Sequence, residues 1–250
     1  MRRRPLGVVT LSLNLWRVSD AAGEAPDTWL RIDLGEFQLW RHCGMISGSW
    51  SATDTLFLAS VTSSGDACTA AGAVPTVDWL EGASTYRRTG AGWELAGANG
   101  APLATLTIDG APKPITSVAE FYTQPPVVTN EVRTALGPPA GLPRGSAPAT
   151  AAFLRGRWVP ADRSFDTHPQ VTFDADGSWT GSDGCNGSKG RWAVDDHGRL
   201  LTTSGFSTEI GCAGAPVPSW VATARRAASD GDRLVLLGQD GADLGRLTRS

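Results

Sequence analysis

The chain has 250 residues and a formal net charge of −3, with 41% hydrophobic and 19% charged residues. This composition is typical of a soluble globular protein rather than a disordered or membrane-embedded one, and the length fits one or two domains. A nucleic-acid-binding surface is expected to show as clustered Lys and Arg with a basic balance. We therefore expect no nucleic-acid partner and no integral membrane segment.

The first nine residues begin like a secretory leader, with a basic start at Arg2–Arg4 followed by apolar residues. The apolar stretch is short and broken by Thr10 and Ser12, and no small-residue cleavage site follows it. Alternation of apolar and polar residues from Val9 to Leu15 favours an opening strand instead. A competing hypothesis is that residues 1–9 are the remnant of a leader, or that a leader precedes them.

The most informative feature is an internal duplication. Four anchors recur 142 positions later, and they are Trp16 and Trp158, Cys43 and Cys185, Gly48 and Gly190, and Trp50 and Trp192. The displacement becomes 144 for Cys68 and Cys212, and 141 for Trp79 and Trp220. Each change falls between anchors, where loops are expected. The sequence therefore predicts two related domains, at residues 10–108 and 153–249.

Short runs of alternating residues, separated by turns such as Asp176-Gly177 and Asp240-Gly241, fill the second copy. They predict a series of β-hairpins. One helix is expected from about Trp220 to Ala228, with Ser219 as its cap. A closed or nearly closed barrel hides the edges of so many short strands. The predicted fold class is mainly β with one helix per domain, as two small barrel-like domains in tandem.

Residues 109–152 have no counterpart in the other copy and are rich in Pro, Ala and Gly, which predicts a linker. A short helix is expected within it, from Asn130 to Leu136. The aromatic residues Phe121 and Tyr122 suggest that part of this linker packs on a domain.

A motif in the second copy resembles the META domain, also called the HslJ-like domain. Its residues are Gly184, Cys185, Asn186, Gly187, Gly190 and Trp192, followed by Thr208 ahead of Cys212. The resemblance covers nearly all of the second copy. The first copy keeps Cys43, Gly48, Trp50 and Cys68 but has His42 and Gly44 where the motif has Gly184 and Asn186, so it is similar to a diverged META domain.

This resemblance implies a compact β-rich domain of a kind often found in envelope lipoproteins or secreted proteins, with a link to stress. It implies no catalytic activity and no cofactor. The motif residues are expected to build a structural turn, in which Asn186 bonds to nearby backbone. A functional alternative is that Asn186 and Thr208 line the mouth of a ligand site.

The four cysteines fall as one pair per copy, Cys43 with Cys68 and Cys185 with Cys212, which favours a disulfide within each copy. Four buried thiols are the alternative, and a reducing cytosol would favour it. A zinc site is disfavoured because no Cys-x-x-Cys spacing is present. We therefore expect no metal.

Six tryptophans occupy matched places in the two copies, which predicts core packing for them. They are Trp16, Trp50, Trp79, Trp158, Trp192 and Trp220. An exposed stacking platform for a sugar is expected, if anywhere, among the other four, Trp29, Trp40, Trp93 and Trp179. Packing remains the favoured interpretation for these as well.

Catalytic residues are not evident. Ser164, Asp166 and His168 are neighbours in an expected loop, but a triad depends on geometry rather than on nearness in sequence. The nucleophile, phosphate-loop, dinucleotide and zinc-helix motifs do not occur. The sequence therefore predicts no enzyme.

The leading hypothesis is a monomeric, non-catalytic protein of the cell envelope or the secreted fraction, structural or stress-related, that interacts with an unknown envelope protein. The alternative is a small hydrophobic-ligand or lipid-binding protein that uses a barrel cavity. A third hypothesis is an inhibitor of extracellular hydrolases. Reduced thiols would instead indicate a cytoplasmic protein.

Overall fold

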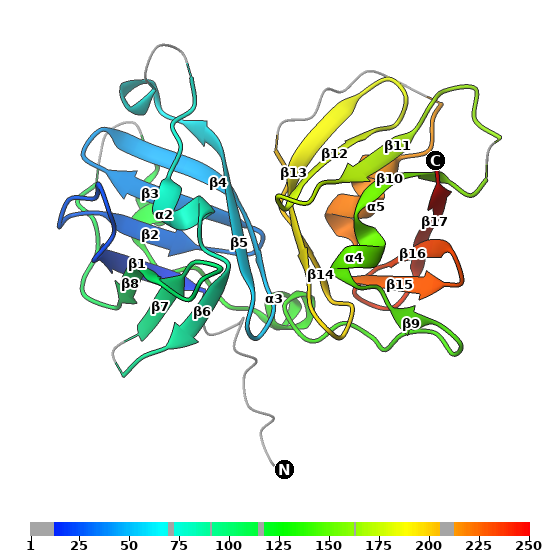
Figure 1. The fold of residues 1–250 in the computed structure, drawn as a ribbon. Helices are drawn as coiled ribbons and strands as arrows, with labels where there is room; N and C mark the ends of the chain where they lie inside the picture. Colours follow the sequence, from blue (N-terminus) through cyan, green and yellow to red (C-terminus); the bar gives the residue numbers. More distant parts are fainter. Residues whose placement is uncertain (1–12, 70–72, 91, 115–117, 163, 206–212) are drawn as a thin grey trace. The chain divides into compact units, whose positions relative to one another are not determined.

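The computed structural model describes residues 13–69, 73–90, 92–114, 118–162, 164–205 and 213–250. The chain divides into two compact units, Met1–Gly137 and Pro138–Ser250. Each unit has its own sheet (Figure 1) and its own core. The N-terminal segment 1–9 lies outside the described residues, as does most of the run expected to form the opening strand.

Eight strands form the sheet of the first unit. In chain order they are β1 (Asn14–Ser19), β2 (Trp29–Ile32), β3 (Glu36–Arg41), β4 (Gly44–Ala52), β5 (Phe57–Ser64), β6 (Thr85–Arg88), β7 (Gly92–Ala96) and β8 (Pro102–Thr107). Their order across the sheet is β5-β4-β3-β2-β1-β8-β7-β6. An isolated bridge pairs Leu56 with Thr85, and the Phe57 N–H donates to the Ser84 carbonyl over 2.9 Å. The sheet thus curls until its two edge strands meet.

The second unit repeats this architecture. Its strands are β9 (Ala147–Pro148), β10 (Gly156–Pro160), β11 (Gln170–Phe173), β12 (Ser178–Ser182), β13 (Gly187–Val194), β14 (Leu200–Thr202), β15 (Arg226–Asp230), β16 (Arg233–Leu237) and β17 (Asp243–Arg249). Their order is β14-β13-β12-β11-β10-β17-β16-β15-β9. Apart from β9, this order matches that of the first unit strand for strand.

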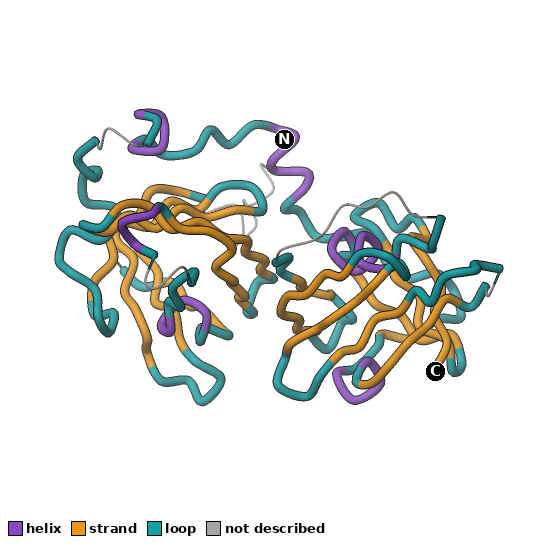
Figure 2. Tube along the Cα trace, turned by 90° about the horizontal axis from the view of Figure 1, so that it is seen from above, coloured by secondary structure: helices purple, strands orange, loops and turns teal. Residues whose placement is uncertain are grey.

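Closure also occurs at the same place in the second unit. An isolated bridge pairs Arg199 with Arg226, and the Leu200 N–H donates to the Arg225 carbonyl over 3.1 Å. Figure 2 shows the strands of each unit curving around an interior. The predicted fold class, mainly β with barrel-like domains, is confirmed.

The interiors are filled by large side chains. Trp16, Trp50 and Trp79 lie in the first core, and Trp158 and Trp192 in the second. Trp220 packs against the second core but is only partly buried. The favoured interpretation, packing, is confirmed for the other four tryptophans, and the alternative of an exposed platform among them is excluded because all of them are buried. Their exposed fractions are 6% for Trp29, 3% for Trp40, 5% for Trp93 and 0% for Trp179.

Among the described residues, an α-helix lies between the fifth and sixth strands of each barrel, α2 (Asp78–Glu81) in the first and α5 (Val217–Thr223) in the second. The predicted helix, from Trp220 to Ala228, was placed too far along the chain at both ends, because α5 runs from Val217 to Thr223. Pro218 fits the first turn, where its missing N–H costs nothing. The chain from Arg226 onward pairs with β16 instead, and this strand, β15, closes the barrel. No described helix is long and apolar enough to cross a bilayer.

The segment expected as a linker carries short elements of its own, η2 (Glu120–Thr123), α3 (Asn130–Ala135), β9 and α4 (Ala151–Leu154). Val128, Val132 and Leu136 pack against the first core. Ala149 belongs to the second core, and Ala151 packs against it. The segment is therefore divided between the two units, and its apolar residues contribute to both.

Candidate functional site

The first predicted disulfide is present. Cys43 lies in the turn between β3 and β4, Cys68 ends the short η1 (Asp66–Cys68), and their Cα atoms are 5.0 Å apart. The Gly65 N–H donates to the Met45 carbonyl over 2.9 Å and places η1 beside this turn. A covalent link over 25 residues stabilises the first unit by roughly 3 to 4 kcal/mol in the chain-entropy model.

The second predicted pair is Cys185 with Cys212. Cys212 lies outside the described residues, as does Thr208 of the motif, so both this pairing and the role of Thr208 stay predictions.

The motif around Asn186 builds a turn on one carboxylate. Asp183 Oδ1 accepts from the backbone N–H groups of Cys185 (2.8 Å) and Asn186 (2.6 Å). Its Oδ2 accepts from the Asn186 side-chain amide over 2.9 Å. These bonds favour the charged carboxylate, so the side chain and backbone of Asn186 hold the pKa of Asp183 below its ordinary value. The sequence predicts a turn at Asp183-Gly184, because such a pair is a recognised turn signal, but it did not identify the Asp183 carboxylate as the acceptor that holds the turn.

Asn186 is 8% exposed, and its amide contributes to the turn. This geometry favours the architectural interpretation over a ligand mouth.

Gly184 connects this turn to the loop between β10 and β11. Its φ is +99°, and a Cβ atom there would lie 2.6 Å from Thr167 Oγ1. Thr167 Oγ1 itself donates to the Asp183 carbonyl over 3.1 Å. A glycine is required both by this backbone conformation and by the close approach of the loop.

Gly190 and Trp192 are also structural. Gly190 pairs across the sheet with Trp179, whose Nε1 would lie 2.7 Å from a Cβ built on the glycine. Trp192 Nε1 donates to the Asp174 carbonyl over 3.2 Å. The indole therefore fixes the hairpin between β11 and β12.

The first unit repeats this arrangement. Gly48 pairs with Phe37, whose ring would lie 2.6 Å from a Cβ built on Gly48. Trp50 Nε1 donates to the Asp33 carbonyl over 2.6 Å. The Gly-x-Trp pattern thus has the same cause in both units: the glycine leaves room for a cross-strand aromatic ring, and the tryptophan donates to a backbone carbonyl of a hairpin.

A buried carboxylate in the first unit was missed. The side chain of Glu24 is 3% exposed and pairs with Arg41. It also accepts from Trp79 Nε1 over 2.6 Å and from Thr28 Oγ1 over 3.1 Å. Both carboxylate oxygens of Glu24 accept from groups of the protein itself. Glu24 therefore links a loop, a hairpin and α2, and is not available to bind a ligand. No sequence signal distinguished it from a solvated loop residue.

Ser164, Asp166 and His168 are exposed loop residues, and no described hydrogen bond joins their side chains. The Ser164 N–H instead donates to Asp162 Oδ1 over 3.0 Å. Among the residues placed by the structure, no group of three His, Cys, Asp or Glu side chains could hold a metal ion.

Each barrel has a hollow at the same position. It lies between the loop after the first strand and the end of the last strand. In the first unit it measures about 390 Å³, and its lining includes Arg17, Asp20, Glu24, Pro26 and Asp109. In the second unit it measures about 320 Å³, and its lining is Arg157, Val159, Pro160, Asp162, Phe165, Thr167, His168, Pro169 and Ser250.

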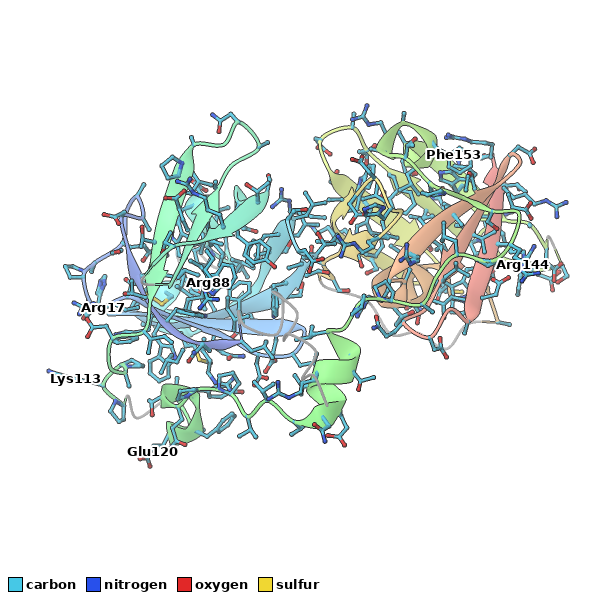
Figure 3. All side chains as sticks on the ribbon, turned by 90° about the horizontal axis from the view of Figure 1, so that it is seen from below. Arg17, Arg88, Lys113, Glu120, Arg144 and Phe153 are labelled. Carbon is cyan, nitrogen blue, oxygen red and sulfur yellow. A yellow bond between two sulfur atoms is a disulfide. The ribbon has the colours of Figure 1, made fainter. Side chains whose placement is uncertain are left out.

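The two hollows differ in charge. In the first, Arg17 Nη1 pairs with Asp109 Oδ2 over 2.6 Å, and its Nε donates to the Pro26 carbonyl over 3.2 Å. Arg17 is labelled in Figure 3. In the second, Val159 stands at the place of Arg17 and Ser250 at the place of Asp109, so this internal pair is absent. Both hollows have the dimensions of a small-molecule site.

The family model that matches the chain is the META domain, over residues 151–250. This interval contains the whole closed barrel of the second unit and its hollow. No curated protein and no solved structure matches the chain.

Proposed function

We propose that the protein is a non-catalytic, exported protein of the cell envelope or the secreted fraction, built from two META-type domains. The observation that carries this proposal is the Cys43–Cys68 disulfide, together with the META match over the second unit. Disulfides persist in oxidising compartments and are rare in reducing ones.

The first unit is proposed to be a diverged META domain. The support is its strand order, which repeats that of the matched unit, and the shared glycine and tryptophan geometry at Gly48 and Trp50. The family model covers the second unit alone. Strand order alone does not transfer an activity, so the proposal concerns fold and descent.

The proposed role is an interaction or stress-related one, exerted by the domain surfaces on an envelope component. A lipid carrier with its ligand inside a barrel has less support, because Trp158, Trp179 and Phe173 fill the second interior with at most 1% exposure.

The test is a thiol count on the natively expressed protein under denaturing, non-reducing conditions, with mapping of its mature N-terminus. We expect no free thiols, cross-linked peptides for Cys43–Cys68 and Cys185–Cys212, and a processed start. Four free thiols together with an intact Met1 would sink the export proposal and indicate a cytoplasmic protein.

A further inference from the structure

The hollow of the second unit contains an arginine without a described partner. Arg157 lies on the outer face of β10, beside the inward-facing Trp158, and its side chain is exposed. No described hydrogen bond or ion pair involves its guanidinium, while its backbone pairs with Thr172 in the sheet and its carbonyl accepts from the Ser250 N–H over 3.3 Å. An arginine fork in this position is free to bind a carboxylate in two-point geometry.

The first unit shows which group such a hollow accommodates. There the guanidinium of Arg17 binds the carboxylate of Asp109, 92 positions away along the chain. The second unit has the cation, supplied two positions earlier in the strand, but no side-chain carboxylate at the place of Asp109, where Ser250 stands. The nearby Asp162 carboxylate caps its own turn instead. A carboxylate from outside the chain would replace the missing partner.

The remaining lining indicates what the carboxylate is attached to. Val159, Pro160, Phe165 and Pro169 give this hollow an apolar wall. Of the polar residues in the lining, Asp162 uses its Oδ1 to cap its own turn through the Ser164 N–H. A volume of about 320 Å³ is at the lower end for small organic ligands.

The geometry points to a binding site in the second unit for a small organic carboxylate with an apolar body, held by Arg157 through its carboxylate and by Phe165 and Val159 through its body. The inference goes beyond the proposed function and depends on the hollow alone. Export and thiol state can fail their test without affecting it.

The experiment is an amide NMR titration of the full chain at low ionic strength, with benzoate as probe. Benzamide, which has the same ring without the charge, and acetate, which has the charge without the ring, are the comparison ligands. We expect benzoate to shift resonances of the loop between β10 and β11, and to bind at least about tenfold more tightly than either comparison ligand. Benzamide should be weaker because a hydrogen bond to a charged group is worth more than a neutral one. Acetate should be weaker because it lacks the apolar ring that would pack on the wall of the hollow.

Three variants assign the effect. Arg157→Gln should weaken benzoate binding by about tenfold to a hundredfold and leave benzamide unchanged. Arg157→Lys should restore part of the loss, since it keeps the charge without the fork. Arg233→Gln, an exposed arginine outside the hollow, is the matched control and should bind benzoate as the wild type does. Benzoate binding that is no tighter than benzamide binding, or that Arg157→Gln leaves unchanged, would overturn the inference.

Discussion

The outer faces of the first four strands differ between the two units, although the strand order and the inner faces match. In the first unit this face carries Leu15, Trp29 and Trp40, which form a small apolar cluster of their own. The cover segment (residues 118–124) lies over it and contributes Val118 and Tyr122. In Figure 3 the labelled Glu120 marks this segment beside the sheet.

A buried arginine holds the cover segment in place. Arg31 is 4% exposed, pairs with Asp33 over 2.7 Å and donates to the Gln124 carbonyl over 3.1 Å. Its guanidinium also lies 5.7 Å from the ring centroid of Phe121 and 5.6 Å from that of Tyr122. These contacts satisfy a cation that would otherwise be costly to bury.

The same face of the second unit is polar and open. The residues at the corresponding positions are Arg157, Gln170, Thr172, Thr180, Ser182 and Lys189, and all of them are exposed or partly exposed. The comparison shows that the same barrel core forms whether the outer face is apolar and covered or polar and open to solvent. One copy uses this face to dock its own chain, and the other leaves it to solvent.

The largest expected effect on stability comes from replacing Trp29, which lies on the covered outer face of the first unit. Trp29→Ala should destabilise the first unit by about 3 to 5 kcal/mol, because it removes a buried ring under the cover segment. Gln170→Ala, at the matched place in the second unit, should change stability by less than about 0.5 kcal/mol. Hydrogen exchange followed by mass spectrometry reports each unit separately. Similar losses of stability in the two variants would contradict the difference between a covered outer face in the first unit and an open one in the second.

Much of the fold was predictable because the anchors repeat. The matched cysteines, glycines and tryptophans fix the register of two copies, and turn signals such as Asp176-Gly177 separate the strands. The end of α5 was not predictable, since Ala224 to Ala228 suits a helix locally, whereas the chain from Arg226 onward forms β15 by pairing with β16. Tertiary context overrides a weak propensity there.

The outer face was harder to predict for a physical reason. Trp29 and Trp40 have no matched tryptophan, and sequence alone does not reveal that a segment about 90 residues later covers them. Arg31 likewise resembles a solvated strand residue until the cover segment is in place. The hollow was missed because it depends on a long loop and on a strand from the other end of the domain.

The disulfide provides the next test of the comparison. Replacing both Cys43 and Cys68 by Ala should cost the first unit roughly 3 to 4 kcal/mol, because the unfolded chain regains the freedom of the closed loop. Denaturant unfolding with unit-resolved hydrogen exchange measures the loss. The second unit is the internal control, and a loss of equal size there would contradict the division into independent units.

The glycines opposite aromatic rings should respond alike, which tests the similarity of the inner architecture. Gly48→Ala and Gly190→Ala should each destabilise their own unit by about 1 to 3 kcal/mol, since the added Cβ overlaps a cross-strand carbonyl and an aromatic ring. Gly90→Ala and Gly187→Ala are matched controls, because a Cβ atom meets nothing within 4 Å at either place. Controls as damaging as the test variants would rule out the overlap as the cause.

The smallest expected effect is a pH dependence confined to the second unit. The folded pKa of Asp183 lies below its ordinary value of 3.8, because the side chain and backbone of Asn186 donate to the carboxylate. The carboxylate therefore contributes stability above pH 3.8, and this contribution is lost as the pH falls through the lowered folded pKa. Solvent screening limits the contribution to less than about 1 kcal/mol.

Asp183→Asn should remove this dependence while leaving an amide that still caps the turn. Arg41 stands at the corresponding position in the first unit, so the substitution at Asp183 has no counterpart there. Unit-resolved unfolding free energies at pH 6 and pH 2.5 should therefore fall more steeply for the wild-type second unit than for the variant, with the first unit unchanged between the two proteins. Equal slopes would show that the turn is held by its backbone geometry, and that the charge of Asp183 adds nothing to the difference between the two hairpins.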